Sequence, residues 1–429
     1  MDNPSEHSDI QTPFRRALVM LALIISGEVI FILPFVLVRI FRPTYLDVFG
    51  LTNLELGTAF SILGTIALIA YIPGGLLADR FSARRLMISG LLLTGAAGTY
   101  LATIPDLASL RVLYAFWGVS TMLLFWAALI RATREWGGHD SQGKAYGLLD
   151  GGRGLTAALF ATGSVALFAW LLPSEIESAT LDERTAALTK IILTFTGAVF
   201  ATAVLVWFVI PEGEQRSSSS SKQRISLEGL RKVLPMPVVW LLSTIVVCAY
   251  VGMKSVAFFS LYARDAFGYD EVAAGQLGTV SFWVRPFAAI GAGILGDLFG
   301  NSRMILLSFA LVILGSMIIA FGVPDYGIYW QLLITVAGTS AGIYALRGIY
   351  FSLFEEAHLP MAYTGSVIGL VSVVGYSPDI FTGPLFGYLI DRSPGALGHQ
   401  HVFAVVAAFS VVGVIATLVF KRVIRSTQN

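Results

Sequence analysis

The sequence predicts an all-α membrane protein whose twelve transmembrane helices form two pseudo-symmetric six-helix bundles. Three observations support this fold class. The 429 residues are 56% hydrophobic and only 13% charged, whereas soluble domains carry about 25% charged residues. Apolar stretches long enough to cross roughly 30 Å of hydrocarbon as helices recur along the chain. One short motif occurs in both halves at corresponding places, which indicates an internal duplication.

The apolar stretches are interpreted as helices because lipid offers no partner for an unpaired backbone N–H or C=O group. They are continuous apolar runs and lack the alternation typical of membrane β-barrel strands. In the first half we predict spans over 17–41, 56–78, 86–104, 110–132, 145–170 and 189–210. In the second half we predict spans over 237–263, 275–298, 302–322, 328–352, 364–390 and 400–421.

The repeated motif closes the second span of each half. Residues 75–81 read Gly-Leu-Leu-Ala-Asp-Arg-Phe, and residues 293–299, 218 positions later, read Gly-Ile-Leu-Gly-Asp-Leu-Phe. The same spacing relates Gly57 to Gly275 and Gly50 to Gly268. A duplicated six-helix unit is expected to form two bundles around a central path, which suits the movement of a solute rather than soluble catalysis.

The chain is predicted to have three parts. Residues 1–210 form an N-terminal six-helix bundle, 211–235 a cytoplasmic linker, and 236–429 a C-terminal six-helix bundle. The linker contains the serine run 217–221, and such Ser-rich polar sequence is typical of flexible segments.

The distribution of basic residues predicts the orientation. Seventeen Lys and Arg residues fall in the segments on the side of the termini and linker, against five on the other side. The positive-inside rule therefore places both termini and the linker in the cytoplasm of a protein integral to the plasma (bacterial inner) membrane. The polar N-terminus shows no cleavable signal peptide.

Cys248 is the single cysteine, so no disulfide within the chain and no cysteine-based metal site is expected.

The duplicated Gly-x-Leu-x-Asp motif, the twelve spans and the long central polar segment resemble the major facilitator superfamily over nearly the whole chain. The resemblance implies a latch that joins the two bundles on the cytoplasmic side in the outward-open state. A carboxylate near a helix N-terminus of the other bundle could form such a contact. The predicted latch residues are Gly75, Asp79, Arg80, Arg84, Arg85, Gly293, Asp297 and Arg303. Simple anchoring of the loop inside the cell is the competing explanation for Arg84 and Arg85.

Within this superfamily, three places resemble the organophosphate:phosphate antiporters. Arg39 stands in a Leu-Val-Arg context, residues 131–136 read Arg-Ala-Thr-Arg-Glu-Trp, and the fifth span begins with the Gly-rich segment 143–154. The resemblance implies a substrate-binding position at Arg153, where that family has a His. Residues 126–128 read Trp-Ala-Ala, where that family often has paired prolines, so the sequence departs from its pattern there.

Charged residues within the spans are the candidate binding residues. A charge at the bilayer centre costs at least ~2.5–3.5 kcal/mol on insertion scales, so these side chains are expected to face the bundle interior. We predict that an anionic substrate is bound by cations from both halves, because Arg and Lys recognise carboxylate or phosphate. The predicted substrate-binding residues are Arg39, Arg153, Lys254, Arg285 and Arg347. Internal ion pairing is the alternative, and Asp150 and Arg153, three residues apart, could form such a pair.

The remaining polar residues of the spans carry further predictions. Glu28 and Asp379 are candidates for a coupling proton, because a buried carboxylate can titrate near neutral pH. Asp379 follows Pro378, so capping of a broken helix is its alternative role. Arg42 is predicted to extend to the outer membrane interface, and His399 and His401 to lie exposed in an outer loop. Aromatic residues such as Trp126, Trp283 and Tyr376 could line the binding site or pack the core.

The function predicted from these features is secondary active transport of a small anionic solute by alternating access, with protons or a counter-anion as the coupled species. We expect no enzymatic activity, cofactor, metal or nucleic-acid partner, and we expect a monomer in the lipid bilayer. A nucleotide-binding Gly-x-x-x-x-Gly-Lys-Ser/Thr loop does not occur in the sequence. A proton-driven exporter of drugs or lipids is the alternative, followed by a transporter-like membrane sensor.

Overall fold

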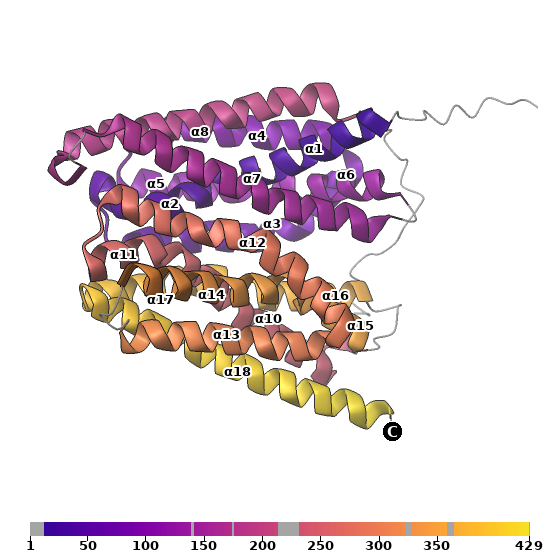
Figure 1. The fold of residues 1–429 in the computed structure, drawn as a ribbon. Helices are drawn as coiled ribbons and strands as arrows, with labels where there is room; N and C mark the ends of the chain where they lie inside the picture. The colour runs from indigo at the N-terminus through magenta and orange to yellow at the C-terminus, as the bar shows by residue number, and fades with distance from the viewer. Residues whose placement is uncertain are drawn as a thin grey trace, which may run out of the picture.

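The computed structural model of the chain describes residues 13–138, 141–173, 176–212, 231–322, 328–357 and 364–428, and every regular element among them is helical. The helices of the first half lie above those of the second half in Figure 1. The predicted all-α membrane fold is confirmed. Most of the predicted linker lies outside the described residues, which include only 211–212 and 231–235 of it.

The first half of the chain forms six helical rods. The first rod joins α1 (Pro13–Val29), η1 (Ile32–Val36) and α2 (Leu37–Phe49). The others are α3 (Asn53–Arg80), α4 (Ala83–Leu101), the joined helices α5 (Leu107–Gly118), η2 (Val119–Trp126) and α6 (Ala127–Gly137), then α7 (Gln142–Leu171) and α8 (Leu181–Val209), with the short η3 (Ile176–Ser178) between the last two.

The second half repeats this plan. Its first rod joins α10 (Pro237–Ser255), η4 (Val256–Phe258) and α11 (Phe259–Phe267). The others are α12 (Glu271–Phe299), α13 (Asn301–Phe321), α14 (Ile328–Ile349) followed by η5 (Tyr350–Ser352) and α15 (Leu353–Glu356), the pair α16 (Thr364–Gly375) and α17 (Pro378–Arg392), and α18 (Ala396–Gln428). The twelve rods correspond in order to the twelve predicted spans.

Several helices extend beyond their predicted apolar cores because capping residues, not apolar ones, define their ends. α8 begins at Leu181 rather than 189, since Thr180 and Glu183 form a reciprocal capping box at its N-terminus. α2 and α11 both end on a left-handed glycine, Gly50 with φ of 60° and Gly268 with φ of 66°. These two glycines are the pair related by the sequence duplication, so the repeat extends to backbone conformation.

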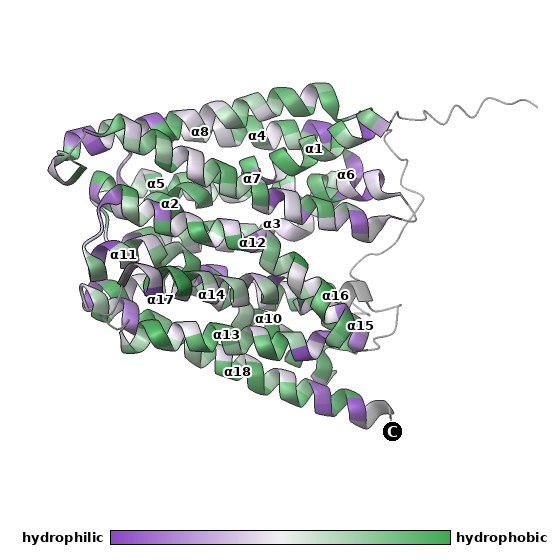
Figure 2. Cartoon of the chain, in the orientation of Figure 1, coloured by the Kyte–Doolittle hydropathy of each residue, from purple (hydrophilic) through white to green (hydrophobic). Residues whose placement is uncertain are grey.

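Nine helices in the described ranges are long and apolar enough to cross a membrane, and the first rod, bent by 41°, is a tenth candidate. α4 has Arg84 and Arg85 in its first turn, and α16 and α17 are shorter, with 12 and 15 residues. Figure 2 shows hydrophobic residues along most of the helices, with hydrophilic residues concentrated toward the ends of the rods.

Irregular backbone lies next to the charged residues of the spans. Glu28 is near the end of α1, just before the bend and Pro34. Arg285 immediately precedes Pro286 within α12, and Asp379 follows Pro378 at the start of α17. Proline removes an intrahelical hydrogen bond and bends a helix. Backbone of this kind at membrane depth is tolerated where it is buried in protein or lines a polar region, which indicates the interior of the bundle.

The two halves meet where α3 packs on α17, α7 on α12, and α2 on α11 and α12. Gly57 of α3 and Gly383 of α17 lie backbone to backbone, and a Cβ atom on either one would overlap the other. Gly387, one turn further along α17, is packed in the same way against the backbone of Asn53. Small residues of this kind let two membrane helices approach closely.

Replacing Gly57 by alanine is expected to separate α3 from α17 and to lower the free energy of unfolding by about 1–3 kcal/mol through overpacking. Thermal unfolding of the purified protein measures the effect. Gly147→Ala on α7 is the matched control, because no atom lies within 4 Å of a Cβ placed there. Equal transition temperatures for the two variants would contradict this packing.

Candidate functional site

A buried carboxylate joins two arginines from opposite halves of the chain. Glu28 Oε2 lies 3.3 Å from Arg153 Nε, and Glu28 Oε1 lies 3.4 Å from Arg285 Nη1. Arg153 Nε also donates to the Gly27 carbonyl at 2.9 Å. All three charged side chains are buried. Because α1 and α7 belong to the first half and α12 to the second, Glu28 links the bundles at this point.

Asp150 forms the second carboxylate of this group. Its Oδ1 lies 3.4 Å from Arg285 Nη2 and 3.9 Å from Arg153 Nη1. The spacing of three residues on α7 places Asp150 and Arg153 on one helix face, as the sequence predicted. We refer to Glu28, Asp150, Arg153 and Arg285 as the central cluster. Paired and hydrogen-bonded charges reduce the cost of burying ions in an apolar bundle.

Arg39 and Arg347 lie near the central cluster but form no ion pair with any carboxylate of the described residues. Arg39 interacts electrostatically with Glu28, Arg285 and Arg347, and its guanidinium lies 5.9 Å from the centre of the Phe282 ring. Arg347, on α14, also lies near Asp150. These two cations therefore keep positive charge that the acids of the cluster do not neutralise.

Lys254 and Asp379 form a second charged group, the Lys254–Asp379 pair. Lys254 Nζ contacts Asp379 Oδ1 directly, and Tyr250 donates its hydroxyl to Asp379 Oδ2 at 3.0 Å. The ammonium lies 4.9 Å from the centre of the Tyr250 ring and 5.7 Å from that of Phe35. Ser377, not Asp379, is the residue before the first turn of α17, and the carboxylate of Asp379 faces Lys254. The capping alternative for Asp379 is therefore wrong.

The charges of both groups do not balance. Five cations (Arg39, Arg153, Lys254, Arg285 and Arg347) stand against three acids (Glu28, Asp150 and Asp379). If all are ionised, the site carries a formal excess of two positive charges. An uncompensated charge in a low-dielectric bundle is costly, so an anion that enters this region gains favourable electrostatic energy.

The prediction for Arg42 is wrong. Its side chain does not extend to a membrane interface but is buried, with 2% exposure. Its Nε donates to Asn53 Oδ1 at 3.1 Å, and its guanidinium lies 4.0 Å from the centre of the Phe258 ring. The hydrogen bond and the ring of the opposite half replace water around the charge.

The exposed position predicted for His399 is wrong too, because the His399 ring is buried and lies 3.0 Å from Asp265. His401 is exposed, as predicted.

The predicted latch residues lie at the end of the molecule that carries Pro13 and the C-terminal part of α18. Asp79, Arg80 and Asp297 are exposed. Arg84 and Arg85 contact Glu212, at the start of the predicted linker, at 2.9 and 2.5 Å. Arg303 Nη1 donates to the Phe299 carbonyl at 3.5 Å, and open space surrounds Gly75 and Gly293. In this conformation, these residues form no ion pair or hydrogen bond between the halves within the described ranges.

The halves are instead joined at the opposite end, which we call the far end. Arg264 Nη1 of α11 lies 2.8 Å from Asp47 Oδ2 of α2, and Arg184 Nη1 of α8 lies 2.9 Å from Glu271 Oε1 of α12. Asp391, at the end of α17, accepts hydrogen bonds from the backbone N–H groups of Asn53 at 3.0 Å and Leu54 at 2.7 Å. A carboxylate of one half thus caps the α3 N-terminus of the other.

The sequence analysis missed these far-end contacts, although two signals were present. Residues 47–50 read Asp-Val-Phe-Gly and residues 265–268 read Asp-Ala-Phe-Gly, at the same spacing of 218 as the other repeats. Residues 387–392 read Gly-Tyr-Leu-Ile-Asp-Arg, which matches the Gly-x-Leu-x-Asp-Arg of residues 75–80. The cap that was predicted for Asp79 at one end is formed by Asp391 at the other.

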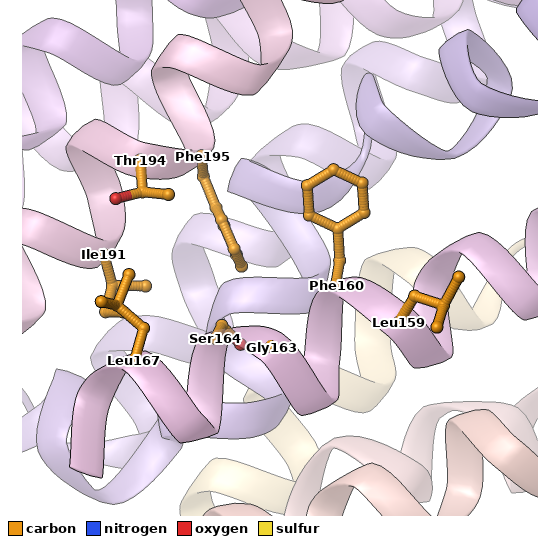
Figure 3. A pocket seen from close by; sticks show the side chains of 8 residues that line it. All are labelled: Leu159, Phe160, Gly163, Ser164, Leu167, Ile191, Thr194 and Phe195. Carbon is orange, nitrogen blue, oxygen red and sulfur yellow. The ribbon is translucent and has the colours of Figure 1, made fainter. Parts of the chain in front are cut away.

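An apolar pocket of about 260 Å³ lies between α7 and α8, away from the charged residues. Figure 3 shows the side chains that line it, which include Leu159, Leu167, Ile191 and Phe195. Leu159 is largely exposed on this surface, as expected for a helix that faces lipid. Among the described residues, no group of three or more His, Cys, Asp or Glu side chains could hold a metal ion.

Comparison with known proteins identifies relatives of similar length. Inner membrane protein YqcE of Escherichia coli (strain K12) is 27% identical over 421 residues, which are 96% of each chain. Inner membrane protein YihN of the same strain is 24% identical over 409 residues, 94% of each chain. The probable nitrate transporter NarT of Staphylococcus aureus (strain Newman) is 28% identical over 156 residues, 36% of this chain and 38% of that protein.

Solved structures share the fold at low sequence identity. The nucleoside transporter NupG matches with a TM-score of 0.69 and 14% identity over 95% of this chain and 98% of its own. A bacterial homologue of the human lysosomal transporter Spinster matches with a TM-score of 0.74 and 14% identity over 97% of this chain and 98% of its own. The model of the family described as Major Facilitator Superfamily matches residues 18–382. The superfamily that the sequence suggested is confirmed, although its organophosphate:phosphate antiporter branch is not distinguished, and the chain belongs to the Major Facilitator Superfamily.

Proposed function

We propose that this inner-membrane secondary transporter carries a small anion by alternating access. The observation that carries the proposal is the excess of two positive charges in the site, with Arg39 and Arg347 outside ion-pair distance of every described carboxylate. The cations come from both bundles, so a bound anion would contact the two bodies that must move relative to each other.

The coupled species in this proposal is a proton or a second anion. Protonation of Glu28 would release Arg153 and Arg285 from their shared acid, and protonation of Asp379 would release Lys254. Either step raises the positive charge available to a substrate anion, so binding of proton and anion would be mutually favourable. Exchange of two anions would use the same cations without protonation.

The excess of basic residues near the termini supports a cytoplasmic location for both termini. The far end is then periplasmic, and the contacts of Asp47, Arg264 and Asp391 hold the transporter closed toward the periplasm. The latch residues around Asp79 and Asp297 would engage in the opposite conformation, when the cytoplasmic ends of the bundles approach each other.

The local similarity to the probable nitrate transporter NarT supports a second candidate within the anion class, an inorganic oxyanion. A drug or lipid exporter and a membrane sensor are the alternatives outside this class. An exporter of apolar compounds has no use for an excess of buried cations, whereas a sensor would bind the anion without carrying it.

Thermal-shift measurements and proteoliposome counterflow test the proposal together. Purified wild-type protein is screened with carboxylates, sugar phosphates, phosphate, nitrate and sulfonates, and each stabilising anion is then tested for counterflow against empty liposomes. Stabilisation with counterflow is the expected result. Stabilisation without counterflow would indicate a sensor, and the absence of stabilisation by any of these anions would contradict the proposed substrate class.

A further inference from the structure

A buried hydroxyl without a partner lies beside the central cations. Tyr344 on α14 is 0% exposed, and its hydroxyl forms no hydrogen bond within the described residues. Tyr344 precedes Arg347 by about one turn of α14, which packs against α12, and on α12 the Nε of Arg285 is also buried without a partner among the described residues. Buried polar groups are nearly always hydrogen-bonded, so the Tyr344 hydroxyl and the Arg285 Nε are groups that a polar ligand could pair.

Four more tyrosines lie together beside the Lys254–Asp379 pair. The rings of Tyr71 and Tyr376 stack at 6.3 Å, and Tyr250 meets Tyr376 edge-on at 5.0 Å. The hydroxyls of Tyr350 and Tyr376 lie 3.3 Å apart. Tyr71 comes from the first half and the other three from the second. We call Tyr71, Tyr250, Tyr350 and Tyr376 the tyrosine wall.

Arg347 connects the tyrosine wall with the central cluster. It lies three residues after Tyr344 and three residues before Tyr350, so these side chains follow one another at helical spacing along α14 and η5. Tyr71 forms no hydrogen bond through its hydroxyl to any described residue and is half-buried. The tyrosine wall therefore adds hydroxyl groups from both halves, and each of them can both donate and accept hydrogen bonds.

Two accessible carboxylates determine which anions fit. The side chain of Asp150 is 44% exposed and that of Asp379 is 20% exposed, next to the cations. An inorganic oxyanion such as nitrate only accepts hydrogen bonds, so ionised carboxylates repel it and cannot bond to it. A hydroxyl group of a ligand donates to a carboxylate and accepts from a guanidinium or a tyrosine.

We propose that the substrate is an organic anion that carries several hydroxyl groups. Its anionic group contacts Arg39, Arg285 and Arg347, and its hydroxyl groups contact Tyr344, the tyrosine wall and the two accessible carboxylates. This inference rests on the proposed anion transport and specifies its substrate class. Tyr344 is the residue that we assign to distinguish hydroxylated anions from their deoxy analogues, since a site built around hydrogen bonds rejects a ligand that leaves them unmade.

Matched ligand pairs test the inference on the purified full-length protein. Apparent affinities are obtained from thermal stabilisation by glycerate against propionate and by glycerol phosphate against propyl phosphate, with nitrate as the bare oxyanion. We expect the hydroxylated member of at least one pair to bind on the order of tenfold more tightly, which corresponds to one additional net hydrogen bond.

Removing the hydroxyl of Tyr344 tests its contribution to ligand binding while all the charged residues of the site stay in place. Tyr344→Phe is expected to reduce the preference for the hydroxylated member on the order of tenfold, which corresponds to the loss of that one net hydrogen bond, and to leave propionate binding unchanged. Tyr114→Phe is the matched control, because it also removes a buried tyrosine hydroxyl but lies in the first half next to Trp117. If Tyr344→Phe does not fold, Tyr71→Phe provides the same measurement from the tyrosine wall.

The possible failures are distinguishable. Equal affinity for hydroxylated and deoxy anions, or tighter binding of nitrate, would overturn the inferred substrate class and leave anion transport intact. An unchanged preference in Tyr344→Phe and Tyr71→Phe would remove the assigned role of the tyrosines. If none of the anions stabilises the wild-type protein, the proposed function itself fails.

Discussion

Arg285→Ala is expected to reduce uptake of the substrate anion about 10- to 100-fold at substrate concentrations below saturation. The reason is that a hydrogen bond to a charged group contributes about 1.5–3 kcal/mol to binding. Arg285 joins Glu28 and Asp150 of the opposite half at 3.4 Å each. Arg285 is therefore the cation best placed to leave the acids of the N-terminal bundle and bind a ligand that lies between the two bundles. Uptake into proteoliposomes at low substrate concentration measures the effect.

The variant should remain folded, because Arg153 stays 3.3 Å from Glu28 and still neutralises it. Lys190→Ala is the matched control, since the exposed Lys190 of α8 forms no side-chain ion pair or hydrogen bond with any described residue. Arg285→Lys should keep the charge but lose the two-armed geometry, and we expect intermediate uptake. Wild-type uptake by Arg285→Ala would show that the central cluster is structural, which is the ion-pairing alternative.

Loss of the far-end charges is expected to open that end of the molecule. In the double variant Asp47→Asn/Asp391→Asn, the ion pair to Arg264 and the charged cap on α3 are both weakened. Both sites are partly exposed, so we assign about 1–1.5 kcal/mol to each rather than the full value for a charged hydrogen bond. A combined 2–3 kcal/mol corresponds to a shift of about 30- to 150-fold in the equilibrium between closed and open far ends.

Spin labels on each half measure this shift without reference to membrane orientation. Cys248 is the single cysteine and is buried, so Cys248→Ser provides a background for labels at Thr103→Cys and Leu397→Cys, two exposed far-end positions. A longer distance should become populated in the double variant. Arg392→Gln is the control, because Arg392 neighbours Asp391 but contacts only Tyr388 of its own helix. An unchanged distance distribution in the double variant would show that α3–α17 packing alone closes the far end.

The sequence predicted the scaffold well because its signals are local. Twelve apolar runs became twelve helical rods, and the glycine pair Gly50 and Gly268 adopts the same left-handed cap in each half. The intramembrane cations were also recognisable, since a charge in an apolar span has to face protein or water. Two of them, Arg153 and Arg285, indeed pair with the carboxylates of Glu28 and Asp150.

The partners of these charges were not predictable from the sequence. Lys254 was expected to act together with Arg39, but its contact is with Asp379, 125 positions away. Arg42 was expected at a membrane interface, yet Asn53 and the Phe258 ring of the other half enclose it. Tyr344 gave no signal, because an aromatic residue in an apolar span is indistinguishable by sequence from core packing.

The sequence by itself determined the number of helices, their order, the duplication and the unusual density of cations in the spans. Only the tertiary structure decided which acid neutralises which cation, which end of the two bundles is closed, and which hydroxyls are left unpaired. The physical reason is that the length of an apolar run and the capping residues at its ends determine the extent of a single helix and are local in the sequence. The depth and rotation of each helix, by contrast, are set by packing between helices, as where Gly57 meets Gly383.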